Sequence, residues 1–93
     1  MGVSVELKTC FAADGLQSGR IALPPGTTTV SDLLILMGKG ARFDFFDEKT
    51  GLPHKDIEVM LNGKDIWFYR SGPATSLRDG DVIEVYPLAL GGG

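Results

Sequence analysis

Histidine and cysteine are nearly missing from this chain of 93 residues, which contains one of each. Zinc sites, iron-sulfur sites and redox-active Cys-x-x-Cys pairs all need several thiolates or imidazoles that converge on one point. Cys10 falls on the polar side of an alternating segment, and His54 follows turn-forming residues, so an idle thiol and a loop imidazole are the favoured interpretations. We therefore expect no bound metal or cofactor, and no catalytic dyad that would make the protein an enzyme.

Basic residues are also scarce, because nine Lys and Arg stand against twelve Asp and Glu, for a formal net charge of -3. Scattered basic residues do not supply the clusters that bind phosphates, which argues against a nucleic-acid or anionic-membrane binder. No stretch approaches the roughly 20 apolar residues of a membrane span. The N-terminal MGVSVELK lacks the basic stretch and apolar core of a secretory signal, so we expect a cytoplasmic location.

What remains has the composition of one globular domain, with 43% hydrophobic and 23% charged residues. Alternating side chains predict a strand from Val3 to Phe11 and a second from Arg20 to Leu23. A helix follows from Val30, where apolar residues recur at helical spacing, and Thr29-x-x-Asp32 is the predicted capping box at its start. The segment 41–55 is predicted to be a loop that phenylalanines anchor on the core.

The second half of the chain reads as three more strands. A strand from Ile57 to Leu61 ends at Asn62-Gly63, a strong hairpin signal, and Asp65 to Tyr69 is the predicted return strand. After an irregular region, Asp79-Gly80-Asp81 turns the chain into a last strand, Val82 to Tyr86. The element order predicts an α+β fold, a mixed sheet of about five strands packed on one main helix. By analogy with ubiquitin, the last strand is expected beside the first, as in a β-grasp domain.

Ordered motifs in the C-terminal third resemble the ThiS/MoaD family of sulfur carriers, most closely the branch that forms the small subunit of molybdopterin synthase. They are Leu61-Asn62-Gly63, then Thr75-x-Leu77-x-Asp79-Gly80-Asp81-x-Ile83-x-Val85-x-Pro87, and a terminal glycine run. That branch usually has two prolines and small residues before its glycines, where this chain has Tyr86-Pro87-Leu88-Ala89-Leu90. The family usually ends on two glycines, whereas this chain carries three, so the reacting residue is either Gly92 or Gly93.

The resemblance implies a β-grasp domain over residues 1–87 and a flexible tail over residues 88–93. It implies that an E1-like partner enzyme uses ATP to adenylate the terminal glycine. A sulfur donor of the cysteine desulfurase or rhodanese type then converts that glycine to a thiocarboxylate. The sulfur would pass to the large subunit of molybdopterin synthase or an equivalent acceptor, and the carrier itself would catalyse nothing. The residues assigned to this chemistry are Gly91, Gly92 and Gly93.

Such a tail has to reach into an active site and expose its last carbonyl group. Glycine suits both needs because it has no Cβ and accepts backbone angles that other residues avoid. Residues 88–93, fully extended, span about 20 Å at roughly 3.3 to 3.6 Å each. We interpret Leu88, Ala89 and Leu90 as the part that the partner's channel grips. The alternative is that the glycines are an incidental flexible end.

An aromatic run, Trp67, Phe68 and Tyr69, lies on the predicted return strand. With Tyr86 on the last strand it is a candidate docking patch, and ordinary surface aromatics are the alternative. Other functions stay open as well: a ubiquitin-like protein modifier joined to lysines through the same glycine, a carrier for thiazole synthesis, or a non-covalent β-grasp adaptor.

Overall fold

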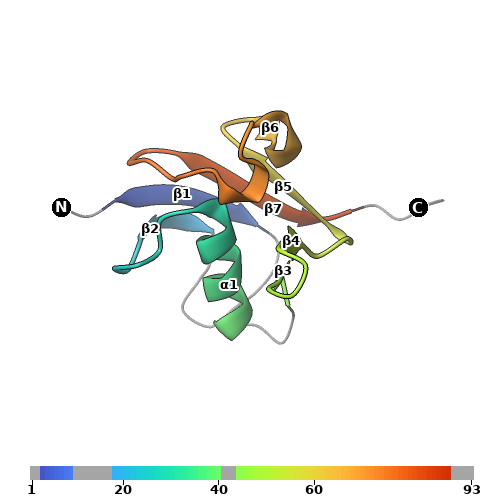
Figure 1. Cartoon of the computed structure of the whole chain (residues 1–93). Coiled ribbons are helices and arrows are strands. Elements are labelled where there is room, and N and C mark those ends of the chain that lie inside the picture. The colour runs from blue at the N-terminus through green and yellow to red at the C-terminus, as the bar shows by residue number, and fades with distance from the viewer. Residues whose placement is uncertain (1–2, 10–17, 41–43, 89–93) are drawn as a thin grey trace.

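A five-stranded mixed sheet forms the body of the protein (Figure 1). The structure is a computed structural model, which describes residues 3–9, 18–40 and 44–88. The strand order is β2-β1-β7-β5-β6. The strands are β1 (Ser4–Thr9), β2 (Gly19–Ala22), β5 (Ile57–Leu61), β6 (Lys64–Asp65) and β7 (Val82–Pro87). β7 runs parallel to β1, and the other neighbouring pairs of this sheet are antiparallel. The last strand therefore lies beside the first, which confirms the predicted α+β, β-grasp arrangement.

The longest helix of the described residues, α1 (Val30–Gly40), covers one face of this sheet (Figure 1). Its apolar side chains meet the inward side chains of β1, β5 and β7, because residues alternate between the two faces of a strand. The completely or almost completely buried side chains include Val5, Leu7, Val30, Leu33, Leu34, Met37, Ile83 and Val85. These are the positions that the strand and helix periods of the sequence predict.

The predicted capping box at the start of α1 is present. The backbone N–H of Asp32 donates to Thr29 Oγ1 at 3.1 Å, while the Asp32 carboxylate accepts from the backbone N–H of Thr28 at 3.0 Å and of Thr29 at 3.1 Å. These bonds satisfy donors that the first turn of a helix leaves without an intrahelical partner. The N–H groups of Thr28 and then Thr29 favour the charged form, so the pKa of Asp32 is lowered although partial burial acts in the opposite direction.

The hairpin between β5 and β6 forms at the predicted Asn-Gly pair. Asn62 has φ 52° and Gly63 has φ 84°, the two positive values that a type I′ turn requires. The Asn62 side chain also accepts from the N–H of Val82 at 2.9 Å and donates to the Asp81 carboxylate at 3.0 Å. The hairpin is thereby tied to the turn that opens β7.

The predicted return strand from Asp65 to Tyr69 is wrong beyond its first residue. β6 ends at Asp65, and a 3₁₀ helix, η1 (Ile66–Phe68), follows. The Asp65 carboxylate accepts from the N–H of Trp67 at 2.9 Å, so this side chain caps the helix and turns the chain out of the ladder. A second 3₁₀ helix, η2 (Gly72–Ala74), lies within the region predicted to be irregular.

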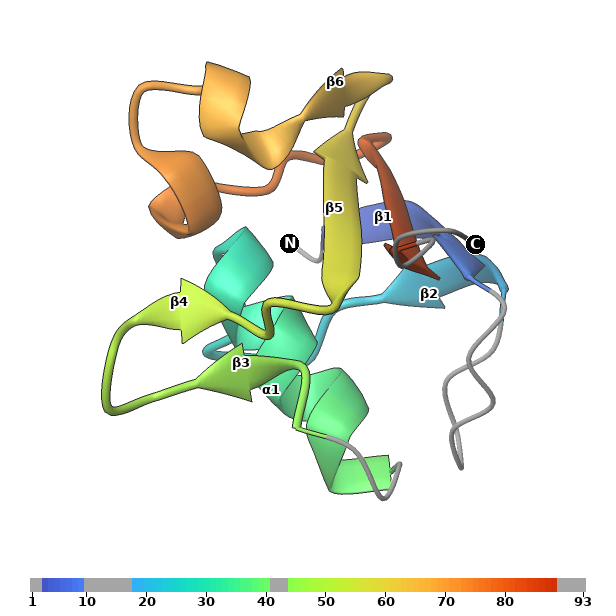
Figure 2. The same ribbon diagram turned by 90° about the vertical axis from the view of Figure 1, so that its right-hand side faces the viewer.

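The loop predicted over residues 41–55 contains structure that the prediction missed. β3 (Phe46–Asp47) and β4 (Leu52–Pro53) form a separate two-stranded hairpin that lies beside α1 (Figure 2). Phe45, just before β3, is fully buried, which confirms it as an anchor on the core. Phe43 and Phe11, like Cys10, lie outside the described residues.

Candidate functional site

The end of β7 is the root of the predicted tail. β7 is paired with β1 on one side and with β5 along five registered positions on the other, and its last residue is Pro87. The N–H of Leu88 then donates to the carbonyl of Asp56 at 2.8 Å, which continues the pairing one residue past the strand. The side chain of Leu88 is 40% exposed. Ala89, Leu90 and the three glycines lie outside the described residues, so their roles stay predictions.

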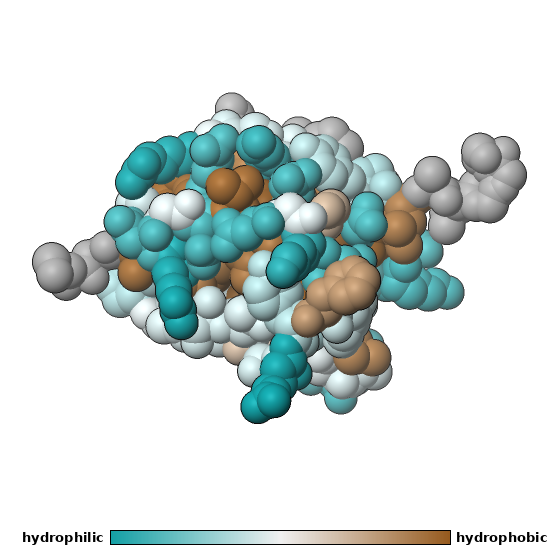
Figure 3. All heavy atoms as spheres, turned by 90° about the horizontal axis from the view of Figure 1, so that it is seen from above, coloured by the Kyte–Doolittle hydropathy of each residue, from teal (hydrophilic) through white to brown (hydrophobic). Residues whose placement is uncertain are grey.

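A groove opens beside this root, between β4, β5 and η1. It has a volume of about 350 Å³, and its lining includes Leu52, Ile57, Val59, Ile66, Trp67 and Leu88. Ile57, Val59 and Ile66 are buried, whereas Leu52 and Trp67 are exposed by 48% and 59%. We call this groove the root groove. Figure 3 views the side of the molecule that carries β6 and η1, where hydrophobic residues interrupt a mostly hydrophilic surface.

The predicted aromatic docking patch is only partly gathered in one place. Trp67 and Phe68 are both exposed on η1, Phe68 by 82%. Tyr69 instead packs against the core and donates its hydroxyl to the carbonyl of Leu61. Tyr86 is half-buried and pairs with Glu58 across β5 and β7.

Leu52 was not among the predicted site residues. It lies 15 positions before Trp67 in the sequence, inside the hairpin that the sequence did not reveal, so only the fold brings it to the same groove. Its one signal in the sequence is an apolar residue directly after the turn at residues 47–51.

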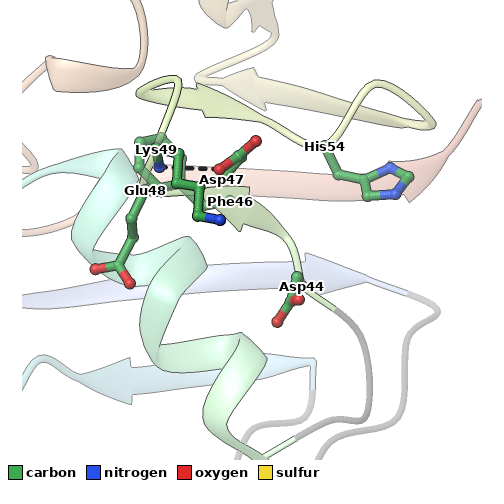
Figure 4. A pocket seen from close by; sticks show the side chains of 6 residues that line it. All are labelled: Asp44, Phe46, Asp47, Glu48, Lys49 and His54. Atoms are coloured by element: carbon green, nitrogen blue, oxygen red, sulfur yellow. Dashed lines mark hydrogen bonds between the residues drawn. The ribbon is translucent and has the colours of Figure 1, made fainter.

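A second hollow lies at the β3–β4 hairpin (Figure 4), lined by Asp44, Phe46, Asp47, Glu48, Lys49 and His54. Its carboxylates point in different directions, and Asp47 accepts from the backbone N–H of Lys49 at 2.9 Å. His54 Nδ1 accepts from the N–H of Asp56 at 2.9 Å, which gives this imidazole a structural role in the loop. Across residues 3–9, 18–40 and 44–88, no three His, Cys, Asp or Glu side chains are placed to hold a metal ion.

No helix in the described ranges combines the length and the apolar character needed to cross a bilayer. Among the described residues, the exposed large hydrophobic side chains lie at the root groove and on η1.

Solved structures with this fold include several small proteins of similar length. The Haloferax volcanii HVO 2177 protein shares 26% identity, with a TM-score of 0.70 over 99% of this chain and 88% of that one. The small archaeal modifier protein 1 of Methanosarcina acetivorans shares 28% identity, with a TM-score of 0.63 over 99% of both chains. Urm1 of Trypanosoma brucei, at 21% identity and a TM-score of 0.60 over 98% and 97% of the two chains, agrees in fold.

No curated protein matches this sequence significantly. The model of the ThiS family, in contrast, matches residues 10–92, which include the helix, every strand except β1 and all but the last residue of the predicted tail. The chain therefore belongs to the ThiS family of small ubiquitin-like carrier and modifier proteins.

Proposed function

We propose that this protein is a sulfur carrier whose C-terminal glycine is adenylated by an E1-like enzyme and converted to a thiocarboxylate. Its sulfur would be used in the synthesis of a molybdenum or tungsten pterin cofactor. ThiS-family carriers in general are not catalysts and work with E1-like activating enzymes and sulfur acceptors. The observation that carries the proposal is the family match from residue 10 to Gly92, which takes in the β-grasp body after β1 together with all but the last residue of the tail.

The chemistry requires activation because a free carboxylate is a poor electrophile. The Gly93 carboxylate attacks the α-phosphorus of ATP, pyrophosphate leaves, and an acyl-adenylate forms. The outer sulfur of a persulfide then attacks the acyl carbon, and AMP leaves. A second thiol then attacks the donor's sulfur in the resulting acyl disulfide. It forms a disulfide with the donor cysteine and releases the thiocarboxylate. The part of the carrier is to present a carbonyl group without a side chain, which glycine does.

The architecture of the described residues supports this role. β7 is an interior strand held by β1 and β5, so the root of the tail is fixed to the most extensively paired part of the sheet. Five residues follow Leu88, and fully extended they span about 17 Å at roughly 3.3 to 3.6 Å each. That length is sufficient to carry Gly93 from the surface of the domain into a partner's active site.

A second candidate function is that of a protein modifier joined to lysine side chains through the same glycine. The observation that favours it is the 28% identity to the small archaeal modifier protein 1 of Methanosarcina acetivorans, over 99% of both chains. Both functions begin with adenylation of the terminal carboxylate and diverge only at the nucleophile, which is a persulfide in one case and an amine in the other.

The test is intact-protein mass spectrometry of the chain produced in a cell that retains the cognate activating enzyme and sulfur donor. A mass gain equal to one sulfur in place of one oxygen, mapped to the C-terminal peptide, is expected for the carrier and identifies the reacting glycine. A variant without Gly92 and Gly93 is the control and should stay unmodified. An unmodified terminus, with the chain recovered on lysines of other proteins, would replace the carrier by the modifier.

A further inference from the structure

Three of the four large hydrophobic side chains that the described residues expose line the root groove. They are Leu52, Trp67 and Leu88, and the fourth, Phe68, is the neighbour of Trp67 on η1. These residues come from three separate parts of the chain, so no local sequence effect explains why they meet. A concentration of exposed apolar side chains on a small protein marks a surface that another molecule covers.

The composition of the groove is that of a protein contact. Its floor is aliphatic, from Ile57, Val59 and Ile66, and one wall is the indole ring of Trp67. Charged and polar side chains form part of the lining, with His54 and Lys55 on the loop after β4, and Glu58 and Asp65 on β5 and β6. An apolar centre with a polar rim is typical of the core of an interface, and tryptophan is enriched among the residues that contribute most to binding.

The backbone of Trp67 is fixed in η1, and its ring packs over Gly72. Its backbone N–H donates to the Asp65 carboxylate at 2.9 Å, and its ring lies over Gly72, where an added Cβ would come within 3.3 Å of a ring carbon. Gly72 has φ 53°, a conformation that favours glycine. This contact orders the indole ring before a partner binds, which lowers the entropic cost of binding.

The position of the groove indicates which partner covers it. Leu88 belongs both to the groove and to the tail, and its hydrogen bond to Asp56 holds the root at this place. From Leu88 to Gly93 the fully extended chain spans about 17 Å, at roughly 3.3 to 3.6 Å per residue. A protein that holds the Gly93 carboxylate in an enclosed active site must therefore bring its own surface up to the root, where the groove lies.

The outward face of the central strands offers a less apolar alternative. Its side chains are Glu6, Lys8, Glu58 and Glu84, of which Lys8 and Glu84 are cross-strand partners, and among them Met60, Val82 and Tyr86, which are partly buried. Such a face favours polar contacts. The root groove is where three of the exposed large hydrophobic side chains of the described residues meet, so an apolar side chain of a partner finds an apolar lining there.

We propose that the root groove is a docking site for the tail-activating enzyme, which inserts an aliphatic or aromatic side chain from the surface beside the channel that takes the tail. This inference rests on the proposed function, because it assumes that such an enzyme binds the tail. It adds a contact, made by Leu52 and Trp67, that lies outside the tail and plays no part in the chemistry at Gly93.

The experiment measures ATP–pyrophosphate exchange by the cognate activating enzyme as a function of carrier concentration. We expect Leu52→Ser to raise the KM for the carrier about tenfold and to leave kcat unchanged, because the substitution removes docking and not chemistry. The matched control is Glu48→Ser, which removes an exposed side chain of the same β3–β4 hairpin that does not line the groove and should leave KM unchanged. Leu52→Thr, which keeps the strand preference of β4, is a second variant and should give the same rise in KM.

Each result decides between explanations. Exchange with the wild-type carrier but an equal KM for Leu52→Ser and Leu52→Thr overturns the docking site and leaves the proposed function standing. Absence of exchange with the wild-type carrier overturns both. A change in the fluorescence of Trp67, the single tryptophan, on removal of residues 89–93 would make the tail itself the occupant. A dimer that Leu52→Ser dissociates would make a second copy the occupant, and either finding would overturn the enzyme as the partner.

Discussion

Asp32 joins the start of α1 to the two residues before it, and its replacement by alanine tests how much that junction contributes to stability. The substitution removes the acceptor of three hydrogen bonds, from the N–H groups of Thr28 and Thr29 and from the Thr28 hydroxyl, at 3.0, 3.1 and 3.2 Å. Thr28 is exposed, so water replaces part of what is lost and no buried donor is left unsatisfied. We therefore expect Asp32→Ala to lower the free energy of unfolding by about 1 to 2 kcal/mol, the upper part of the range of roughly 0.5 to 2 kcal/mol for loss of a helix cap.

The measurement is urea or thermal unfolding followed by circular dichroism. In a domain of this size, roughly 4 to 8 °C of melting temperature corresponds to each kcal/mol, so a decrease of about 5 to 15 °C is expected. Glu48→Ala is the matched control, because it removes an exposed carboxylate of the same charge from the β3–β4 turn. It should change stability by no more than about 0.5 kcal/mol.

The same carboxylate predicts a pH dependence. The pKa of Asp32 is lowered in the folded state from its ordinary value of 3.8, chiefly by the N–H of Thr28. A lowered pKa means that the contribution of the carboxylate is fully present above the unfolded pKa and is lost as pH falls through the folded one. The difference in stability between the wild type and Asp32→Asn should therefore be constant near neutral pH and shrink below about pH 4. A difference that stays equal on acidification would refute the role given to these hydrogen bonds.

Three further predictions separate the body of the protein from its tail. Deletion of Gly92 and Gly93 should change the free energy of unfolding by no more than about 0.5 kcal/mol yet abolish ATP–pyrophosphate exchange, and a marked loss of stability would show that the tail is packed. Leu34→Asp should destabilise the domain by several kcal/mol in urea unfolding, because Leu34 is fully buried and the new charge has no partner; a native-like midpoint would contradict the assigned core. Gly63→Ala should cost about 1 to 2 kcal/mol in the same assay, since Gly63 has φ 84° in open space, and an unchanged midpoint would argue against the type I′ turn.

The elements that sequence reasoning predicted well are those specified by local chemistry. The Asn62-Gly63 pair has few conformations available other than a tight hairpin, and the capping box supplies its own hydrogen-bond partners. The inward positions of β7, Ile83 and Val85, followed directly from alternation. These features depend on residues close together in the chain.

One error has a cause nearby in the chain that strand propensity concealed, and the other depends on packing against the core. The aromatic run from Trp67 to Tyr69 has high strand propensity, yet the Asp65 carboxylate caps η1 and Tyr69 finds an acceptor on Leu61. The β3–β4 hairpin has two residues in each strand, too few to be stable alone, and Phe45 buried in the core holds it there. Strand propensity reflects packing on a sheet, so it misleads where the sheet ends.

The sequence alone determined the fold class, the order of the sheet's main elements, the core faces and the identity of the residues that follow β7. It could do so because periodicity, turn residues and caps act over a few positions. Only the tertiary structure decided that Leu52, Trp67 and Leu88 share one groove, since they come from β4, η1 and the end of β7. Their proximity arises from the packing of the β3–β4 hairpin beside α1 and of η1 beside β5, and no pattern within any one segment encodes it.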